Sequence, residues 1–241
     1  ISKLWSSCNL DATAVYLTQG LHRAFQRQPQ EVALVHLDEL GERRWTFAQL
    51  VDEVARQAAA LQARGVRAGD RVALLSGNSD VLIIAILACW WLGAVACPLN
   101  IRWNKNELAY ALSDSDAVLL LHHAALPFTP EHTTCLSFEN LEREAKGLTP
   151  LQDTRTGGEH LAALLYTGGT TGRSKGVMLS HANFWSASMT RGAELNNPIR
   201  WDVEIVGRTV RIAEHHHEKL LAPERHLRIQ FRNQRFTPQE E

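Results

Sequence analysis

The 241-residue sequence has few cysteines, no long block of like charge and no visible secretory signal. Its four cysteines lack a Cys-x-x-Cys spacing, so we expect free thiols in a reducing compartment rather than a disulfide framework. Lys and Arg (25) nearly balance Asp and Glu (26), which argues against nucleic acid as a partner. No basic segment followed by an apolar one begins the chain. These absences favour a cytoplasmic globular protein.

Long apolar runs are also scarce, and a single one needs an explanation. Residues Val81–Leu99 carry no charge over about the length of a membrane span. Ser79 offers a helix N-cap before this run, Gly93 a helix end within it, and Pro98 a stop near its end. We therefore predict a buried helix followed by a buried strand, without integral membrane insertion. A membrane-inserted segment is the alternative.

Helix and strand patterns alternate through the first four-fifths of the chain. Leu17, Leu21 and Phe25 predict one amphipathic helix, and Thr46 opens another with a capping box. Apart from the buried pair above, helices are expected at 16–28, 46–65, 104–116 and 137–147, and strands at 31–37, 71–77, 117–121 and 160–167. This order predicts a layered α/β fold with a mostly parallel sheet and helices on both faces.

The pattern changes near residue 198, where charges become interleaved throughout. We expect residues 1–197 to form one incomplete domain and 198–241 a divergent tail. A different module, a frame-shifted readthrough and a disordered segment all remain open for this tail. Its histidines (His215, His216, His217 and His226) lack metal-ligand spacing, and its Arg228, Arg232 and Arg235 suit a solvated face, so no metal site is predicted.

Other residues attract attention for their chemistry. His122 and His123 follow an apolar strand and are interpreted as a strand end rather than a catalytic base. His181 suits a helix start and a position near bound phosphate equally well. Trp90 and Trp91 lie inside the apolar run, which favours a place in the core.

The most unusual local composition is "TGGTTGRSKG", residues 167–176, directly after the last predicted strand. Glycines let backbone N–H groups converge on an anion, threonines add hydroxyl donors, and Lys175 adds a charge suited to phosphate. The segment is not a Walker A loop, because Gly176 rather than Ser or Thr follows the lysine. We predict a cradle for a nucleoside triphosphate; a glycine-rich hairpin turn without a ligand is the alternative.

The longer segment "YTGGTTGRSKGV" closely resembles the signature loop of the adenylate-forming superfamily, which includes acyl-CoA synthetases, non-ribosomal adenylation domains and luciferases. Gly168 stands where Ser is commoner and Ser174 where Pro is commoner, and neither change removes the hydroxyl pair or the lysine. The similarity extends upstream through residues 65–103 and downstream through "MLSHANF", and it covers about residues 21–197. The fatty-acid and related acyl-CoA ligases are the most similar branch.

The resemblance implies a two-step reaction. A carboxylate attacks the α-phosphate of ATP and releases pyrophosphate, and the thiol of coenzyme A then displaces AMP. ATP, Mg²⁺, coenzyme A and a small carboxylic acid, a medium- or long-chain fatty acid, are the implied ligands. The implied triphosphate-binding residues are Thr167, Gly168, Gly169, Thr170, Thr171, Gly172 and Lys175. Among them Thr170, Thr171 and Lys175 are expected to stabilise the departing pyrophosphate.

Later motifs of the superfamily cannot be found in the sequence. These are the Tyr-Gly-x-Thr-Glu stretch, the Gly-Asp strand and the mobile C-terminal domain with its catalytic lysine. We therefore expect a truncated N-terminal fragment that is inactive alone and could self-associate through its incomplete face. The alternative is a non-catalytic module that binds nucleotide phosphates and acts through a partner.

Overall fold

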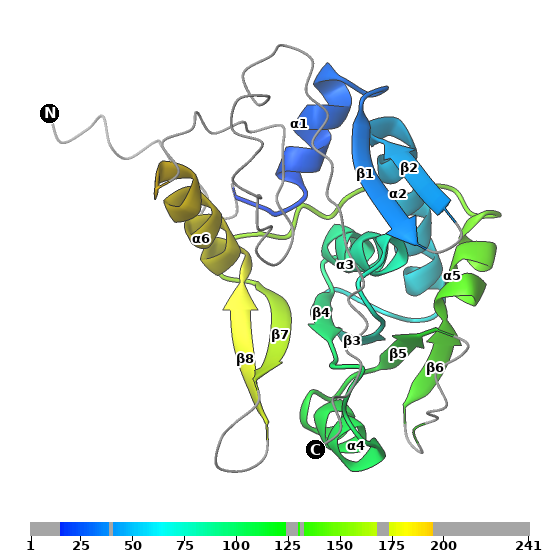
Figure 1. The fold of residues 1–241 in the computed structure, drawn as a ribbon, viewed down its shortest axis with the longest axis vertical. Coiled ribbons are helices and arrows are strands. Elements are labelled where there is room, and N and C mark those ends of the chain that lie inside the picture. Colours follow the sequence, from blue (N-terminus) through cyan, green and yellow to red (C-terminus); the bar gives the residue numbers. More distant parts are fainter. Residues whose placement is uncertain (1–14, 39–40, 124–129, 131–132, 168–173, 195–241) are drawn as a thin grey trace, which may run out of the picture.

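The computed structural model describes residues 15–38, 41–123, 130, 133–167 and 174–194, which form an α/β fold around a six-stranded sheet (Figure 1). The strand order is β6-β5-β3-β4-β7-β8; β8 is antiparallel to β7, and all other neighbouring pairs are parallel. The strands are β3 (Arg71–Leu75), β4 (Val95–Pro98), β5 (Leu119–His122), β6 (Thr134–Ser137), β7 (Leu161–Thr167) and β8 (Lys175–Ser180). The predicted largely parallel sheet is confirmed.

Helices cover both faces of this sheet, because its central strands are apolar on both sides. In β3, Val72 and Leu74 belong to the core beneath α2 (Phe47–Ala63), α3 (Asp80–Leu92) and α5 (Phe138–Ala145). Ala73 and Leu75 face the other way and pack with α4 (Lys105–Asp114). Successive strand residues point to opposite faces, so one strand contributes to two cores.

The helix ends follow the capping signals in the sequence. Thr46 forms the predicted capping box with Gln49 at the start of α2. The Ser79 side chain accepts the Leu82 amide at 3.3 Å at the start of α3, and Gly93, with a φ of 80°, ends that helix. The apolar run is thus divided between α3 and β4. Within the described ranges, no helix has both the length and the apolar character needed to span a bilayer.

The strand and the first helix expected in the N-terminal region are both present, although each differs in one respect from the simplest expectation. The strand expected at 31–37 does not join the main sheet; β1 (Val32–Asp38) pairs antiparallel with β2 (Gly41–Thr46) in a separate two-stranded sheet. In α1 (Gln19–Arg27), Leu21 and Ala24 are buried, whereas Phe25 is 38% exposed. A step of four residues advances a helix by about 400°, so the expected stripe drifts about 40° away from the core at each repeat.

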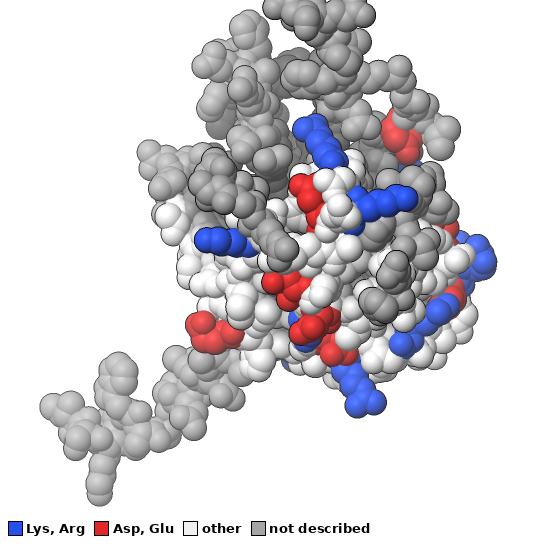
Figure 2. All heavy atoms as spheres, turned by 90° about the horizontal axis from the view of Figure 1, so that it is seen from below, with Lys and Arg blue, Asp and Glu red and all other residues white. Residues whose placement is uncertain are grey.

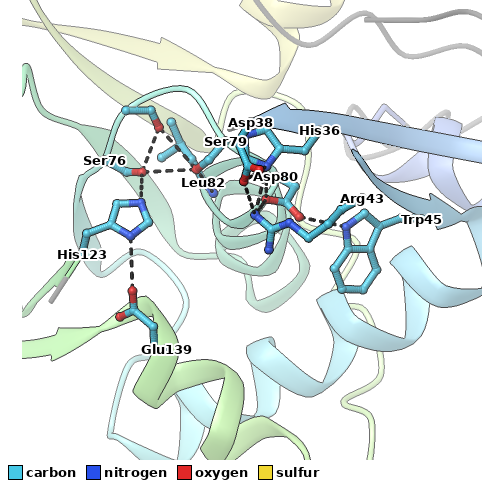
Figure 3. Close-up of polar contacts among 11 residues, drawn as sticks. His36, Asp38, Arg43, Trp45, Ser76, Ser79, Asp80, Leu82, His123 and Glu139 are labelled. Carbon is cyan, nitrogen blue, oxygen red and sulfur yellow. Dashed lines mark hydrogen bonds and ion pairs between the residues drawn. The ribbon is translucent and has the colours of Figure 1, made fainter. Parts of the chain in front are cut away.

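A buried carboxylate holds the small sheet against α3 (Figure 3). Asp80, the first residue of α3, is 1% exposed. Its oxygens accept hydrogen bonds from Arg43 Nη2 at 2.7 Å and Trp45 Nε1 at 3.0 Å, both from β2. A charge that is removed from water needs such partners, and the N-terminal end of a helix favours a negative one. The β1–β2 hairpin is therefore docked through polar contacts as well as through the core.

Candidate functional site

The predicted phosphate loop connects β7 and β8, which form an antiparallel hairpin at one end of the sheet (Figure 1). Thr167, the last residue of β7, pairs with Lys175, the first residue of β8, and Thr167 Oγ1 donates to the Lys175 carbonyl at 3.5 Å. Both residues are exposed. The other predicted binding residues lie outside the described residues: Gly168, Gly169, Thr170, Thr171 and Gly172. The structure thus pairs Thr167 with Lys175 where the loop begins and ends.

Tyr166 anchors this loop root to α4. Its hydroxyl donates to Asp114 Oδ2 at 2.7 Å, with the Ala111 carbonyl at 3.2 Å, and its ring meets the Trp103 ring edge-on at 6.0 Å. Burial, together with the neighbouring Asp114 carboxylate, raises the pKa of the Tyr166 hydroxyl, which therefore stays protonated as a donor. Sequence reasoning missed Asp114 and Trp103, because nothing in the local pattern links them to a tyrosine more than fifty residues away.

Gly176, the last glycine of the motif, is explained by packing within the hairpin. It lies opposite Tyr166 in the strand register. A Cβ atom at this position would approach Leu164 Cδ1 to 3.0 Å and Tyr166 Cζ to 3.4 Å. Glycine therefore lets both side chains lie across β8 and supports the anchor of the loop root.

His181 is the first residue of α6 (His181–Glu194), at the end of the hairpin opposite the loop (Figure 1). It is 1% exposed, and its Nδ1 accepts the Leu17 amide at 3.4 Å. Burial, assisted by the nearby His160, lowers the pKa of His181 to about 4, so the ring is neutral at pH 7. Of its two predicted roles, the structure shows the helix start.

The remaining chemically notable residues have structural surroundings. Trp90 and Trp91 are buried, and their indole N–H groups donate to the carbonyls of Ala162 and Leu151 at 2.9 and 2.8 Å. His122 ends β5 as expected. Within the described ranges, no cluster of His, Cys, Asp and Glu side chains could hold a metal ion. The tail histidines lie outside those ranges.

Charge is mixed over the face seen in Figure 2, where Lys and Arg side chains lie among Asp and Glu side chains rather than in one patch. The described residues of that face therefore form no broad basic surface. A local site for an anionic group suits this arrangement better than a track for a polyanion.

The largely parallel sheet with helices on both faces, joined to a glycine-rich hairpin loop, is the architecture of the N-terminal domain of adenylate-forming enzymes. Residues 21–206 match the AMP-binding enzyme family, and the chain belongs to that family.

Known proteins similar to this chain are mainly CoA ligases. A feruloyl-CoA synthase from Amycolatopsis sp is 38% identical over 169 residues, which cover 67% of this chain and 32% of that protein. A 2-succinylbenzoate–CoA ligase from Bacillus cytotoxicus is 31% identical over 182 residues, which cover 76% and 36%. The chain thus spans about a third of the length of these two curated relatives.

Two solved structures show the same fold. O-succinylbenzoate coenzyme A synthetase from Bacillus subtilis, in complex with ATP and magnesium ion, has a TM-score of 0.65 and 27% identity, covering 74% of this chain and 47% of that one. A fatty acyl-adenylate ligase from L. pneumophila, in complex with acyl adenylate and pyrophosphate, has a TM-score of 0.64 and 26% identity, covering 74% and 32%. The confirmed family therefore includes enzymes that bind ATP or pyrophosphate.

Proposed function

We propose that this chain supplies the triphosphate-binding part of an AMP-forming acid–CoA ligase. The observation that carries the proposal is the pairing of Thr167 with Lys175 at the root of the glycine-rich loop. Both residues are exposed, and a hydroxyl and an ammonium group are side-chain types that bind the oxygens of a phosphate chain. The hydrogen bond between Tyr166 and Asp114 holds the end of β7 at which Thr167 lies.

The chemistry requires stabilisation of the leaving group. When a carboxylate oxygen bonds to the α-phosphorus, the bond to pyrophosphate breaks and negative charge builds up on the departing oxygens. Lys175, with Thr170 and Thr171, meets that charge, and Thr167 with Gly168, Gly169 and Gly172 holds the remaining phosphate oxygens. Mg²⁺, carried in with ATP, supplies additional positive charge at the phosphates when it is bound.

We infer that the acid is a medium- or long-chain fatty acid, activated in the cytoplasm and passed to coenzyme A. The likeness to a fatty acyl-adenylate ligase structure supports this acid class. Because relatives include a feruloyl-CoA synthase and a 2-succinylbenzoate–CoA ligase, aromatic acids are the class to test beside fatty acids. The three described cysteines, Cys89, Cys97 and Cys135, are free thiols, which suits a reducing compartment.

We further propose that residues 1–197 are only part of the domain and that the chain alone does not complete the reaction. In that state it binds magnesium pyrophosphate or ATP weakly, because contacts to base, ribose and acid are missing. A partner chain, or a second copy against the exposed sheet edge, would be needed to complete a site. Val177 and Met178 on the edge strand β8 are 41% and 69% exposed, which supports such association.

The test measures magnesium pyrophosphate binding by calorimetry. Lys175→Ala should weaken binding about 10- to 100-fold, the equivalent of one hydrogen bond to a charged group. Lys146→Ala is the matched control, because Lys146 is also an exposed lysine but lies beyond α5, where it forms an ion pair with Glu142 at 3.1 Å. Equal affinity in all three proteins would rule out the phosphate role.

A second measurement addresses stand-alone activity. The purified chain is assayed for acid-dependent exchange between ATP and pyrophosphate, over fatty and aromatic acids, with Lys175→Ala as control. We expect no exchange from the folded chain. Exchange that is lost in Lys175→Ala would show a complete adenylation site and overturn the fragment hypothesis, and the best acid would then identify the substrate class.

A further inference from the structure

Three polar side chains that the proposed ligase reaction does not use meet at the carboxyl edge of the sheet. Ser76 follows β3, His123 follows β5, and Glu139 lies in the first turn of α5, directly after β6. Because β3, β5 and β6 are parallel, their carboxyl ends share one edge. Open α/β sheets bind ligands at this edge. The point where α3 and α4 leave for opposite faces lies between β3 and β4, so only Ser76 is next to it.

The three side chains form a continuous relay (Figure 3). Ser76 Oγ lies 2.9 Å from His123 Nε2, and His123 Nδ1 lies 3.3 Å from Glu139 Oε1. The neutral ring with its proton on Nδ1 donates to the carboxylate and accepts from the serine hydroxyl. A nucleophile, a base and a third group that orients the base are the elements of nucleophilic catalysis by serine.

The surroundings of the three side chains suit a nucleophile at Ser76, a base at His123 and an orienting carboxylate at Glu139. Desolvation opposes ionisation of Glu139, but hydrogen bonds from its own amide, His123 and Ser137 outweigh it and lower the pKa of the carboxyl, which therefore orients the base as an anion. Ser76 is 8% exposed, whereas the side chains of His123 and Glu139 are 35% and 52% exposed. The serine is thus held within the fold, while the base opens toward solvent.

The serine hydroxyl has a second acceptor, the Gly77 carbonyl at 2.8 Å, and Ser79 Oγ lies 3.3 Å away. Rotation about the Cβ–Oγ bond moves the single proton between Gly77 and His123. Ser79 is also the N-cap of α3, so the positive end of that helix lies close to Ser76.

We propose that Ser76, His123 and Glu139 form a second, nucleophilic site that hydrolyses small carboxylic esters, independently of adenylate formation. Ser76 Oγ bonds to the carbonyl carbon while its proton passes to His123 Nε2. The bond to the alcohol oxygen breaks, and the alcohol leaves with that proton. Water then attacks the acyl-serine and gives one proton to Ser76 Oγ through His123, and the carboxylic acid departs. Ser76 and His123 are catalytic residues, and Glu139 is a positioning residue.

The test uses a small fluorophosphonate, which the serine oxygen attacks at phosphorus with loss of fluoride. Peptide mass mapping of the full chain should place the adduct on Ser76, with no adduct on Ser79 three residues away. His123→Gln should lower the maximal inactivation rate at least about tenfold with little change in the probe concentration for half-maximal rate, as expected when a general base is lost. Glu139→Gln should have a smaller effect of the same kind. Ser113→Ala, a change at an exposed serine on α4, should leave labelling unchanged.

Hydrolysis of p-nitrophenyl acetate provides the second readout and should be lost in Ser76→Ala. Circular dichroism establishes that each variant is folded, and Glu139→Gln keeps the test open if His123→Gln does not fold. No adduct on Ser76 in the folded chain would overturn the proposal. A labelling rate that neither His123→Gln nor Glu139→Gln changes would also overturn it, because the relay would then have no role. The outcome is separate from that of the pyrophosphate experiment.

Discussion

The glycine that ends α3 allows a quantitative test of the packing around the sheet. Gly93 and Gly65 both follow helices with positive φ, at 80° and 89°, but their surroundings differ. A Cβ at Gly65 would meet nothing within 4 Å. A Cβ at Gly93 would lie 2.6 Å from Thr156 Oγ1 and 3.2 Å from Ala68 Cβ. Alanine at the two positions therefore separates backbone strain from steric overlap.

We expect Gly65→Ala to lower the free energy of unfolding by about 1–2 kcal/mol, the cost of the left-handed conformation for a residue with a Cβ. Gly93→Ala should lower the free energy of unfolding by the same amount and by about 1–3 kcal/mol more, because the added Cβ overpacks the site. Rotation of Thr156 away from the new Cβ would break its contact with Thr154 Oγ1 at 3.0 Å. Thr154 Oγ1 is itself held by a hydrogen bond to the Trp91 carbonyl at 3.1 Å.

Urea unfolding followed by far-ultraviolet circular dichroism measures both variants against the unchanged chain. The difference between the two alanine variants is the informative quantity, because backbone strain cancels. Equal losses of free energy would show that the segment carrying Thr154 and Thr156 does not pack against the end of α3. The reasoning from this close approach would then be refuted.

Two further predictions concern His181 and the loop anchor. Burial lowers the pKa of His181 from 6.5 to about 4, so the unfolded chain binds a proton more readily than the folded chain does. The contribution of this group to the free energy of unfolding is therefore complete above pH 6.5. It is lost, by about 3 kcal/mol, as the pH falls from 6.5 through 4. Urea unfolding of His181→Gln should show a smaller loss between these pH values, and an unchanged loss would contradict the assignment. Tyr166→Phe removes the 2.7 Å bond to Asp114 and should weaken magnesium pyrophosphate binding about 3- to 10-fold. Tyr110→Phe, which removes a 3.2 Å bond to the same carboxylate from within α4, should bind as the unchanged chain does, and an equal effect would exclude a specific anchor.

Local signals were sufficient for the helices whose ends are set by their own residues. Thr46 with Gln49, Ser79 and Gly93 act within a few residues of their positions in the chain, so the sequence alone places them correctly. Strands β2, β6 and β8 were missed because their pairing comes from partners rather than from their own pattern. β2 reads "GERRWT", which is strongly charged, and it becomes a strand only alongside β1.

In the candidate sites, too, some features can be predicted from a contiguous motif and others arise only from the fold. The motif around Thr167 and Lys175 is contiguous, so its residue types by themselves indicate phosphate chemistry. The anchor at Asp114 arises only when β7 lies beside the end of α4. The relay of Ser76, His123 and Glu139 was equally hidden, because the three residues follow three different strands. His123 was interpreted only as a strand end, and no neighbour in sequence suggested a partner.

Parallel strand direction explains why both candidate sites share one edge of the sheet. β7 is parallel to β4, which is parallel to β3, so the loop after Thr167 leaves from the same edge as Ser76. The two strands are two positions apart in the sheet, which corresponds to about 10 Å. Their supports are nevertheless different, since Tyr166 rests on α4 whereas His123 rests on Glu139 of α5. Tyr166→Phe should therefore weaken phosphate binding without slowing serine labelling, and His123→Gln should do the reverse. If either variant lost both phosphate binding and serine labelling, the two candidate sites would depend on each other.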